Sequence, residues 1–321
     1  SLLSVENLQV QFQTKKGINT AVDGVSFSVE KGRILGIVGE SGCGKSVTSM
    51  SILQLLGSNA RISGGSIKLD GKELIGLPEK EMCRIRGNDI AMIFQDPMTA
   101  LNPTLTIGTQ LMEPIMLHQN CGKKEAWTRA VDVLKRVGIA APEKRMKEYP
   151  HQLSGGMRQR VMIAMAVSCE PRLLIADEPT TALDVTIQAQ ILELMCELRE
   201  KMGTAIMLIT HDMGVVAETA DDVLVLYAGK AVEYGSIEDI FERPKHPYTQ
   251  GLLNSIPRLD EDVELLNTIE GTVPAPDAMP AGCRFAPRCP YGKDRCMKEK
   301  PGVYHAGNSL VSCFRYEGEK E

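Results

Sequence analysis

A glycine-rich stretch, GESGCGKS at residues 39–46, constrains the fold of this chain more than any other feature. It follows the apolar run ILGIV at residues 34–38 and precedes VTSMSILQLL, which is compatible with a helix. Short runs of only apolar residues are typical of strands that are buried on both faces of a parallel sheet. The stretch therefore predicts a strand, a tight loop and a helix in succession, as in an α/β fold.

The same stretch matches G-x-x-x-x-G-K-S, the pattern of loops that bind nucleotide phosphates. In such a loop the backbone N–H groups surround the phosphates, Lys45 neutralises the β and γ oxygens, and Ser46 can ligate Mg²⁺. A glycine-rich turn that contains Lys-Ser by chance is the alternative, which the flanking strand and helix disfavour. The expected nucleotide-binding residues are Gly39, Ser41, Gly42, Cys43, Gly44, Lys45, Ser46 and Val47.

A second apolar run, LLIA at residues 173–176, ends at two acidic residues, Asp177 and Glu178. An acid at the C-terminal end of a strand can hold Mg²⁺, and its neighbour can polarise an attacking water. Two acids in this position can alternatively cap the next helix. Because a phosphate-binding loop needs a metal partner, we expect Asp177 to hold Mg²⁺ and Glu178 to polarise the water.

The other apolar patterns divide the chain into sheet and helical parts. Half-buried antiparallel strands are predicted where apolar residues alternate with polar ones, at Leu8, Val10, Phe12, Phe27, Val29, Ile67 and Leu69. Continuous apolar runs at 206–209 and 223–227 predict further buried strands. A helical pattern replaces them between about 97 and 165, where it is punctuated by Pro114, Gly122, Gly138 and Pro142.

These patterns predict an α/β core with a parallel sheet and an antiparallel β subdomain, formed by residues 1–96 and 166–240. Residues 97–165 are expected to form a helical subdomain inserted into that core. Residues 241–321 are expected to form a C-terminal extension. Its stretch IPRLDEDVELLNTIEGTVPAPDAMPAGC is rich in proline, glycine and acids, which is typical of an extended linker or arm.

The charge and the ends of the chain exclude several classes of protein. A net charge of −5 leaves no electrostatic footprint for nucleic acid or an anionic membrane surface. No apolar run approaches the roughly 20 residues that cross a bilayer. The opening SLLSVENLQV also lacks the basic-then-apolar order of a signal peptide. We therefore expect a cytosolic location, where disulfides are rare.

Four of the nine cysteines lie in the last forty residues, spaced C-x5-C-x6-C-x16-C: Cys283, Cys289, Cys296 and Cys313. Four thiolates from an arm without an evident core suit a metal centre, which would supply folding free energy. Zinc sites usually contain a C-x2-4-C pair, which this stretch lacks, so a [4Fe–4S] cluster is preferred over zinc. Four unrelated thiols are the alternative, and His305 can substitute for one ligand.

The segment LSGGMRQR at residues 153–160, which precedes LLIADEP, resembles the signature loop of ATP-binding cassette (ABC) ATPases. The resemblance covers residues 1 to about 240. It implies that Gln95 of IFQDP contacts Mg²⁺ and water, that Asp184 belongs to the D-loop, and that His211 of ITHD lies near the γ-phosphate. A lone histidine is more often structural, but ligands of α/β folds collect at the strand ends, and His211 follows the run IMLIT.

The resemblance also implies a second phosphate clamp made of Ser154, Gly155 and Gly156. A hydroxyl group and bare backbone N–H groups at a helix N-terminus can bind a γ-phosphate. In this family the clamp closes over ATP that a partner subunit holds, so ATP joins two such domains and hydrolysis releases them. Met157 replaces the glutamine of many members, which leaves these donors in place. Phe12 occupies the position where the family stacks an aromatic ring on adenine, although a strand core residue is the alternative.

Three segments together, GCRFAPRCP at 282–290, HPYT at 246–249 and SGGMRQR, resemble the dipeptide/oligopeptide permease ATPases of the D type. That likeness implies an importer at the cytoplasmic face of the membrane, in which two different ATPases pair beneath two permeases. An extracytoplasmic binding protein delivers the peptide, and ATP, Mg²⁺ and the [4Fe–4S] cluster are the expected cofactors. The alternatives are a soluble ABC ATPase that acts on nucleic acid or ribosomes, and a redox-responsive regulator. The first usually needs a long coiled coil or two tandem cassettes, and the sequence has neither.

Overall fold

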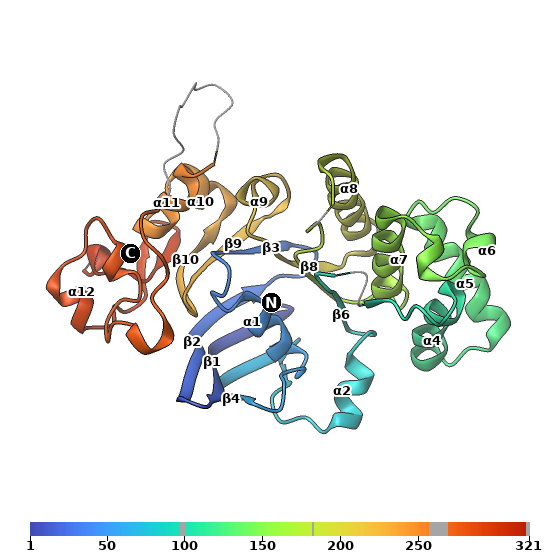
Figure 1. Ribbon diagram of the computed structural model, residues 1–321, viewed down its shortest axis with the longest axis horizontal. Coiled ribbons are helices and arrows are strands. Elements are labelled where there is room, and N and C mark those ends of the chain that lie inside the picture. Colours follow the sequence, from blue (N-terminus) through green and yellow to red (C-terminus); the bar gives the residue numbers. More distant parts are fainter. Residues whose placement is uncertain (97–99, 182, 257–268, 319–321) are drawn as a thin grey trace. The chain divides into compact units, whose positions relative to one another are not determined.

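The described residues of the computed structural model are 1–96, 100–181, 183–256 and 269–318. The chain divides into two compact units (Figure 1). The first unit comprises Ser1–Val29, Ile34–Ile75 and Ile209–Glu321, and the second comprises Glu30–Arg33 and Gly76–Leu208. Within the described ranges, every helix is too short or too polar to cross a membrane.

The first unit begins with an antiparallel sheet in the strand order β2-β1-β4-β5. Its strands are β1 (Leu3–Thr14), β2 (Gly17–Val29), β4 (Ala60–Leu69) and β5 (Lys72–Glu73). Leu8 and Val10 of β1 are fully buried, as the alternation predicts, and Phe12 is half-buried. One face of this sheet therefore contributes to the core of the unit.

A second run of strands in the first unit has the order β11-β12-β10-β9-β3. These strands are β3 (Ile34–Val38), β9 (Asp222–Tyr227), β10 (Lys230–Ser236), β11 (Tyr304–Ala306) and β12 (Ser309–Val311). The wholly apolar β3 is buried at all five residues and lies parallel to β9, as its composition predicts. The strand β10 is antiparallel to β9 and to β12, which makes the last hairpin an extension of this sheet.

The helices of the first unit are α1 (Lys45–Ile52), α9 (Met213–Thr219), α10 (Ile237–Glu242), α11 (Pro247–Asn254) and α12 (Asp294–Lys298). Three of them have an N-cap residue whose side chain accepts a hydrogen bond from a backbone N–H group of the first turn: Asp212 for α9, Ser236 for α10 and His246 for α11. Such caps satisfy backbone N–H groups that have no partner within the helix. They explain why these short helices begin where they do.

The second unit contains the strand order β8-β7-β6, with β6 parallel to β7. The strands are β6 (Ile90–Ile93), β7 (Leu173–Asp177) and β8 (Ala205–Ile209), whose last residue belongs to the first unit. The helices are α2 (Glu79–Ile85), α4 (Ile107–Gln119), α5 (Lys123–Arg136), α6 (Pro142–Arg145), α7 (Gly155–Val167) and α8 (Val185–Met202). The chain between β6 and β7 is thus helical where it is described.

Pro114 does not punctuate the helical pattern, contrary to the sequence-based expectation, because it lies inside α4. A proline in a helix interior removes one backbone hydrogen bond and costs about 3 kcal/mol. Leu111 and Ile115 on either side of it are fully buried, and their packing offsets this cost. The other three residues do mark helix ends: Gly122 precedes α5, Gly138 follows it, and Pro142 begins α6.

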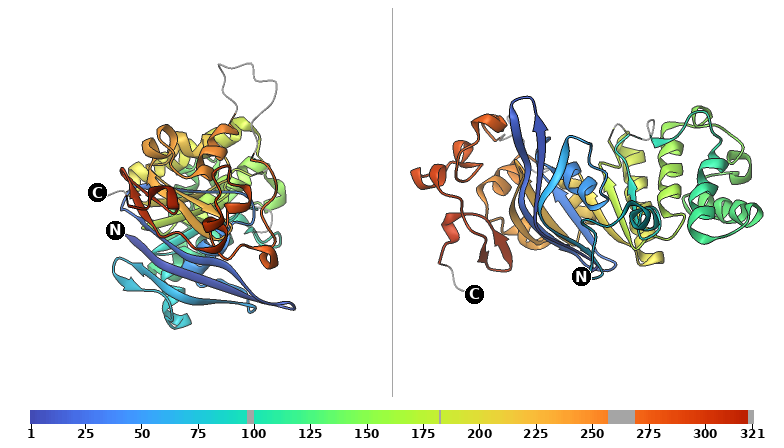
Figure 2. Two further views of the ribbon diagram at one scale, coloured as in Figure 1. Left: turned by 90° about the vertical axis from the view of Figure 1, so that its left-hand side faces the viewer. Right: turned by 90° about the horizontal axis from the view of Figure 1, so that it is seen from below.

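The expectation of a coreless C-terminal arm is wrong for its described part. Phe285, Ala306 and Val311 are at most 2% exposed, and β12 pairs with β10 (Figure 2). These apolar residues come singly from turns and a short hairpin, so the sequence shows no apolar run there. The predicted linker falls partly on residues 257–268, which lie outside the described residues.

Candidate functional site

The phosphate loop, residues 39–46, connects β3 to α1 and depends on its glycines. Gly39, Gly42 and Gly44 have φ angles of 149°, 76° and 98°, which favour glycine over residues with a side chain. A Cβ on Gly39 would also overlap the carbonyl oxygen of Leu226 and approach the Cys43 Sγ to 2.8 Å. The loop therefore brings bare backbone close to β9, and Gly44 is the N-cap residue of α1.

Lys45 is 5% exposed, and its ammonium group turns back onto the loop. Its Nζ donates to the carbonyl oxygens of Gly39 at 2.7 Å and Glu40 at 3.2 Å, and it lies 3.8 Å from the Cys43 Sγ. Burial raises the pKa of the Cys43 thiol although the charge of Lys45 opposes this. A buried ammonium group held by carbonyl oxygens can exchange these acceptors for phosphate oxygens. Ser46 is exposed on the same turn.

His211 belongs to the same unit as the phosphate loop. The N–H group of Thr210 donates to the carbonyl oxygen of Ile37 at 3.2 Å, so the chain before His211 lies beside the end of β3, where the loop begins. His211 is exposed, and the next residue, Asp212, begins α9. Phe12, the proposed adenine partner, lies in β1 and pairs with Asn19 and Ala60 in the two adjacent strands.

In the second unit, Gln95 is hydrogen-bonded to the residue that follows β7. Asp177 is the last residue of β7 and is 5% exposed. The next residue, Glu178, accepts a hydrogen bond from the Gln95 Nε2 at 3.1 Å and another from the Thr181 hydroxyl at 3.0 Å. Glu178 has a φ of 47°, which is uncommon for residues other than glycine, asparagine and aspartate. Residues held in such conformations cluster at functional sites.

Two other predicted residues of the second unit begin helices. Ser154 precedes α7, and its hydroxyl accepts from the N–H group of Met157 at 3.3 Å. Asp184 precedes α8 and accepts from the N–H group of Ile187 at 2.9 Å. Gly155 and Gly156 form the first turn of α7, so their N–H groups lie at the positive end of a helix of 13 residues.

The predicted nucleotide-binding residues thus fall into two sets. Residues 39–47, Phe12 and His211 belong to the first unit, whereas Gln95, residues 154–156, Asp177, Glu178 and Asp184 belong to the second. The expected Mg²⁺ ligands Ser46, Gln95 and Asp177 are divided between them. Their joint action on one nucleotide stays a prediction.

The four clustered cysteines line one cavity of about 170 Å³ in the first unit, together with His246, Phe285 and Arg315. Burial, strengthened by the neighbouring thiols, raises the pKa of Cys283 to about 11. Burial is also the largest cause of the raised pKa values of Cys289 and Cys313. His305 is not among the lining residues. The sequence-based prediction that these four thiols lie together is therefore confirmed.

No three side chains of His, Cys, Asp or Glu in the described ranges have a geometry that holds a single metal ion. The prediction that a [4Fe–4S] cluster staples the arm is therefore not supported by the described residues. The described part of the arm is held by packing and hydrogen bonds, as the buried Phe285 and the hairpin show.

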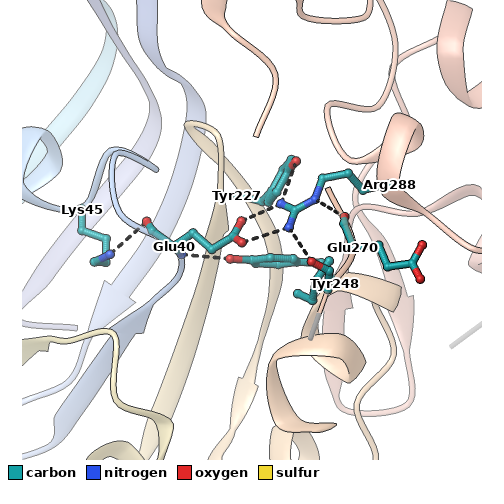
Figure 3. A network of polar contacts seen from close by, with 7 residues as sticks. Glu40, Lys45, Tyr227, Tyr248, Glu270 and Arg288 are labelled. Atoms are coloured by element: carbon teal, nitrogen blue, oxygen red, sulfur yellow. Dashed lines mark hydrogen bonds and ion pairs between the residues drawn. The ribbon is translucent and has the colours of Figure 1, made fainter. Parts of the chain in front are cut away.

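The sequence-based prediction gave no role to Glu40 of the phosphate loop or to the two residues that contact it, Tyr248 and Arg288. Tyr248 accepts a hydrogen bond from the N–H group of Glu40, at 2.9 Å, and Arg288 forms an ion pair with the Glu40 carboxylate (Figure 3). Tyr248 lies in the HPYT segment and Arg288 in the GCRFAPRCP segment, but the sequence analysis used these segments only as marks of family resemblance. Glu40 itself occupies a variable position of the loop pattern.

The HPY segment has a clear structural role. Burial, with a smaller effect of the Arg315 charge, lowers the pKa of His246 to about 3, so its ring is neutral. The ring Nδ1 then accepts from the N–H group of Tyr248 at 3.1 Å and begins α11. Pro247 is the first residue of the helix, where its missing N–H group costs nothing. This cap directs the Tyr248 hydroxyl to the phosphate loop.

Comparisons with known proteins match the whole chain. The family model for ABC transporters matches residues 22–181. The oligopeptide transport ATP-binding protein AppD of Bacillus subtilis (strain 168) is 56% identical over 321 residues, which cover 99% of this chain and 98% of AppD. The chain belongs to the ABC transporter family. Members of this family hydrolyse ATP to power transport.

A second family model, the C-terminal region of oligopeptide/dipeptide transporters, matches residues 232–296 of this ABC ATPase. The ABC ATPase is 54% identical to the dipeptide transport ATP-binding protein DppD of Bacillus subtilis (strain 168), covering 100% of this chain and 96% of that protein. It is 52% identical to the oligopeptide transport ATP-binding protein OppD of Escherichia coli (strain K12), covering 98% and 93%. These relatives are all transport proteins, so the alternatives of a nucleic-acid enzyme or a redox regulator are not favoured.

Among solved structures, the ABC ATPase is similar to the dimeric ATP-binding cassette MJ0796 in a post-hydrolysis state bound to ADP and phosphate. The TM-score is 0.66 at 27% identity, covering 73% of this chain and 98% of MJ0796. It is also similar to cbiO1 from Clostridium perfringens, part of the transporter complex cbiONQ, with a TM-score of 0.65 at 28% identity, covering 75% and 91%. The cassette fold with its mixed α/β sheets is thereby confirmed.

Proposed function

We propose that this ABC ATPase is the ATP-hydrolysing subunit of an importer for dipeptides or oligopeptides. The observation that carries the proposal is its match over nearly the whole chain to oligopeptide and dipeptide transport ATP-binding proteins. The strand, loop and helix at residues 34–52 supply the phosphate-binding geometry that such a function needs.

The nucleotide is held by both sets of residues in this proposal. Backbone N–H groups of the phosphate loop bind the β- and γ-phosphates, and Lys45 leaves the carbonyl oxygens of Gly39 and Glu40 to neutralise them. Phe12 stacks on adenine. Ser46, Gln95 and Asp177 would hold Mg²⁺, which neutralises charge on the phosphates when bound.

Hydrolysis depends on Glu178, which accepts the proton of the attacking water. Gln95 and Thr181 hold its carboxylate by hydrogen bonds, which fixes its direction before ATP arrives. His211 donates a hydrogen bond to the transferred phosphoryl group. Most of the rate enhancement then comes from positioning and from charge stabilisation, as in other phosphoryl-transfer enzymes.

Assembly with other subunits completes the function. The N–H groups at the start of α7 and the hydroxyl of Ser154 bind the γ-phosphate of ATP that is held by a second ABC ATPase. Asp184 lies at the same subunit interface. We propose that the second ATPase is a different paralogue, that both sit on two permease subunits at the cytoplasmic face of the membrane, and that an extracytoplasmic binding protein supplies the peptide. Closing and opening of the ATPase pair drives the permeases.

We further propose that the cavity of the four cysteines holds a [4Fe–4S] cluster. Each cysteine of such a cluster binds a different iron atom, so the four sulfurs need not meet at one point. The support for this proposal is that all four thiols line one cavity of about 170 Å³. The cluster would cross-link the arm. Iron and sulfide contents of the anaerobically purified protein test this, and zinc without iron would refute it.

The substitution Glu178→Gln tests the function. It removes the proton acceptor but keeps an oxygen for the hydrogen bonds of Gln95 and Thr181, so ATP binding should persist while hydrolysis falls at least about a hundredfold. Steady-state phosphate release and size-exclusion chromatography with ATP, in the presence of the partner ATPase, measure both effects. The matched control is Glu193→Gln on the exposed face of α8.

We expect the Glu178→Gln protein to accumulate as a closed ATP-bound pair, and the Glu193→Gln protein to behave as wild type. Rapid steady-state hydrolysis by Glu178→Gln would refute the role of Glu178. Failure of the wild-type protein to bind MgATP at all would refute the proposed function.

A further inference from the structure

The segment Cys283–Cys289 connects the cysteine cavity to the rest of the first unit. Its two end residues line the cavity, and within the segment each cysteine has an arginine beside it that contacts another part of the first unit. Arg284 donates to the carbonyl oxygen of Ala228 and, at 3.3 Å, to the Asp23 carboxylate. The second arginine, Arg288, contacts the phosphate loop.

Arg288 uses all of its hydrogen-bonding capacity. Its two terminal nitrogens donate to the two carboxylate oxygens of Glu40, at 2.8 and 3.1 Å. The other donors reach the carbonyl oxygens of Ile269 and Glu270 and the hydroxyl of Tyr227. The side chain is 5% exposed, and the hydrogen bond to Glu40 is the largest cause that raises its pKa. This fork of two parallel bonds is directional, which a lysine cannot reproduce.

Glu40 is the second residue of the phosphate loop and is held at three points (Figure 3). Its carboxylate binds Arg288, its N–H group donates to the Tyr248 hydroxyl at 2.9 Å, and its carbonyl oxygen accepts from the Lys45 Nζ at 3.2 Å. Lys45 is the residue expected to bind the phosphates. Two residues of the C-terminal region therefore fix the peptide units next to the phosphate-binding lysine.

The aromatic side chains behind this network make it rigid. Tyr227, Tyr248 and Phe285 are at most 2% exposed. Phe285 lies between the two arginines in sequence. Its ring packs edge-on against Tyr227, with the ring centroids 5.1 Å apart, and at a tilt against Tyr248, with the centroids 5.4 Å apart. A shift of the Cys283–Cys289 segment would consequently move Arg288 and the ring that carries the Tyr248 hydroxyl together.

We propose that Arg288 is a positioning residue of the ATP site, which holds the phosphate loop in its binding conformation through Glu40. This inference rests on the proposed function, because it assumes that the loop binds ATP. A loop that is already ordered loses less conformational entropy when the phosphates bind. ATP affinity then depends on correct docking of the C-terminal region against the phosphate loop.

A purely anchoring role for Arg288 predicts a different result. If the ion pair only attached the C-terminal region, its loss would lower stability and the fraction of active protein. The Michaelis constant for ATP would then be unchanged, because every folded molecule would still carry an ordered loop. The two roles therefore predict different effects on KM and on ATP affinity when the ion pair is lost, whereas a loss of stability does not distinguish them.

The test is Arg288→Gln in the full chain, with Arg288→Lys as the conservative variant. Arg243→Gln is the matched control, because Arg243 pairs with Asp239 on α10 and does not contact the loop. Titration with the fluorescent analogue mant-ATP in the presence of Mg²⁺ gives the dissociation constant. Steady-state hydrolysis gives KM and kcat, and circular dichroism reports whether the fold is kept.

For Arg288→Gln we expect the dissociation constant to rise about tenfold, which corresponds to about 1.4 kcal/mol of binding free energy. KM should rise by the same factor while kcat per folded molecule stays within about twofold. Arg288→Lys should lie between wild type and Arg288→Gln, because it keeps the charge but loses the fork. Glu40→Gln combined with Arg288→Gln should add little to either single change, since both remove one interaction.

An unchanged dissociation constant in folded Arg288→Gln protein would overturn the inference while leaving the proposed function intact. An equal loss in Arg243→Gln would also overturn it, because the effect would then not depend on the loop contact. If the wild-type protein itself failed to bind MgATP, the proposed function would fail first.

Discussion

Replacing Gly39 by alanine is expected to destabilise the protein far more than replacing Gly42, although both glycines belong to the phosphate loop. Both have positive φ angles, 149° and 76°. A residue with a side chain pays roughly 1–2 kcal/mol for the left-handed conformation. A Cβ on Gly42 would meet no atom within 4 Å, so this strain is the whole loss expected for Gly42→Ala.

Gly39→Ala adds a steric cost to that strain. Its Cβ would overlap the carbonyl oxygen of Leu226 and lie 2.8 Å from the Cys43 Sγ. Leu226 lies in β9, which pairs with β3 on one side and β10 on the other, so the carbonyl group cannot move without breaking a sheet. We therefore expect Gly39→Ala to cost at least about 4 kcal/mol, the range of severe backbone strain and overpacking.

Urea unfolding followed by far-ultraviolet circular dichroism measures both losses as shifts of the transition midpoint. Gly122→Ala is the control, because its Cβ meets no atom and its φ is negative, and it should stay within about 0.5 kcal/mol of wild type. If Gly39→Ala gives no soluble protein, Gly44→Ala provides a graded test, since its Cβ would lie 3.1 Å from the Ala21 carbonyl oxygen. Equal losses at Gly42 and at the other two loop glycines would refute the reasoning.

Two further predictions concern the attachment of the C-terminal region. Burial raises the pKa of Asp23, but the ammonium groups of Lys230 and Lys300 outweigh it and hold the pKa below 3.8. The stability from Asp23 is thus present above the unfolded-state pKa and is lost as the pH falls through the lower folded-state pKa. Asp23→Asn should cost about 1 kcal/mol at pH 7 and less below pH 3.8, and equal shifts of the urea midpoint at both pH values would contradict this. Phe285→Ala should cost about 3–5 kcal/mol in the packing of the C-terminal region. Limited proteolysis should then cleave that region faster, and wild-type resistance would show that Phe285 does not hold it.

Much of the fold follows from local sequence patterns. The runs at residues 34–38, 173–176, 206–209 and 223–227 each form a strand as predicted. Wholly apolar runs of this length leave few alternatives to a strand buried on both faces. The strand β6 was missed although its sequence IAMI is as long and as apolar as the runs at 173–176 and 206–209. The hairpin of β11 and β12 was missed because its two strands have only three residues each and contain no continuous apolar run. Pro114 was misassigned because packing decided its place and not its own backbone preference.

The C-terminal region shows where sequence patterns stop being informative. The clustering of four cysteines in a short segment predicted that they lie together, and the structure places all four around one cavity. Whether the arm has a core could not be read from the sequence, since Phe285 comes from a turn and Val311 from a strand of three residues. Burial of single residues depends on what the rest of the chain places over them.

The sequence by itself determined the phosphate loop, since glycines at fixed spacing and an adjacent lysine are required by the local backbone and by the charge of a phosphate group. It also determined the caps and the buried strands, which depend on neighbours within a few residues. Only the tertiary structure decided that Arg288 pairs with Glu40, 248 residues earlier in the chain, and that Tyr248 accepts a hydrogen bond from the same residue. Contacts over such separations are set by how the strands and the C-terminal region pack, which no local pattern encodes.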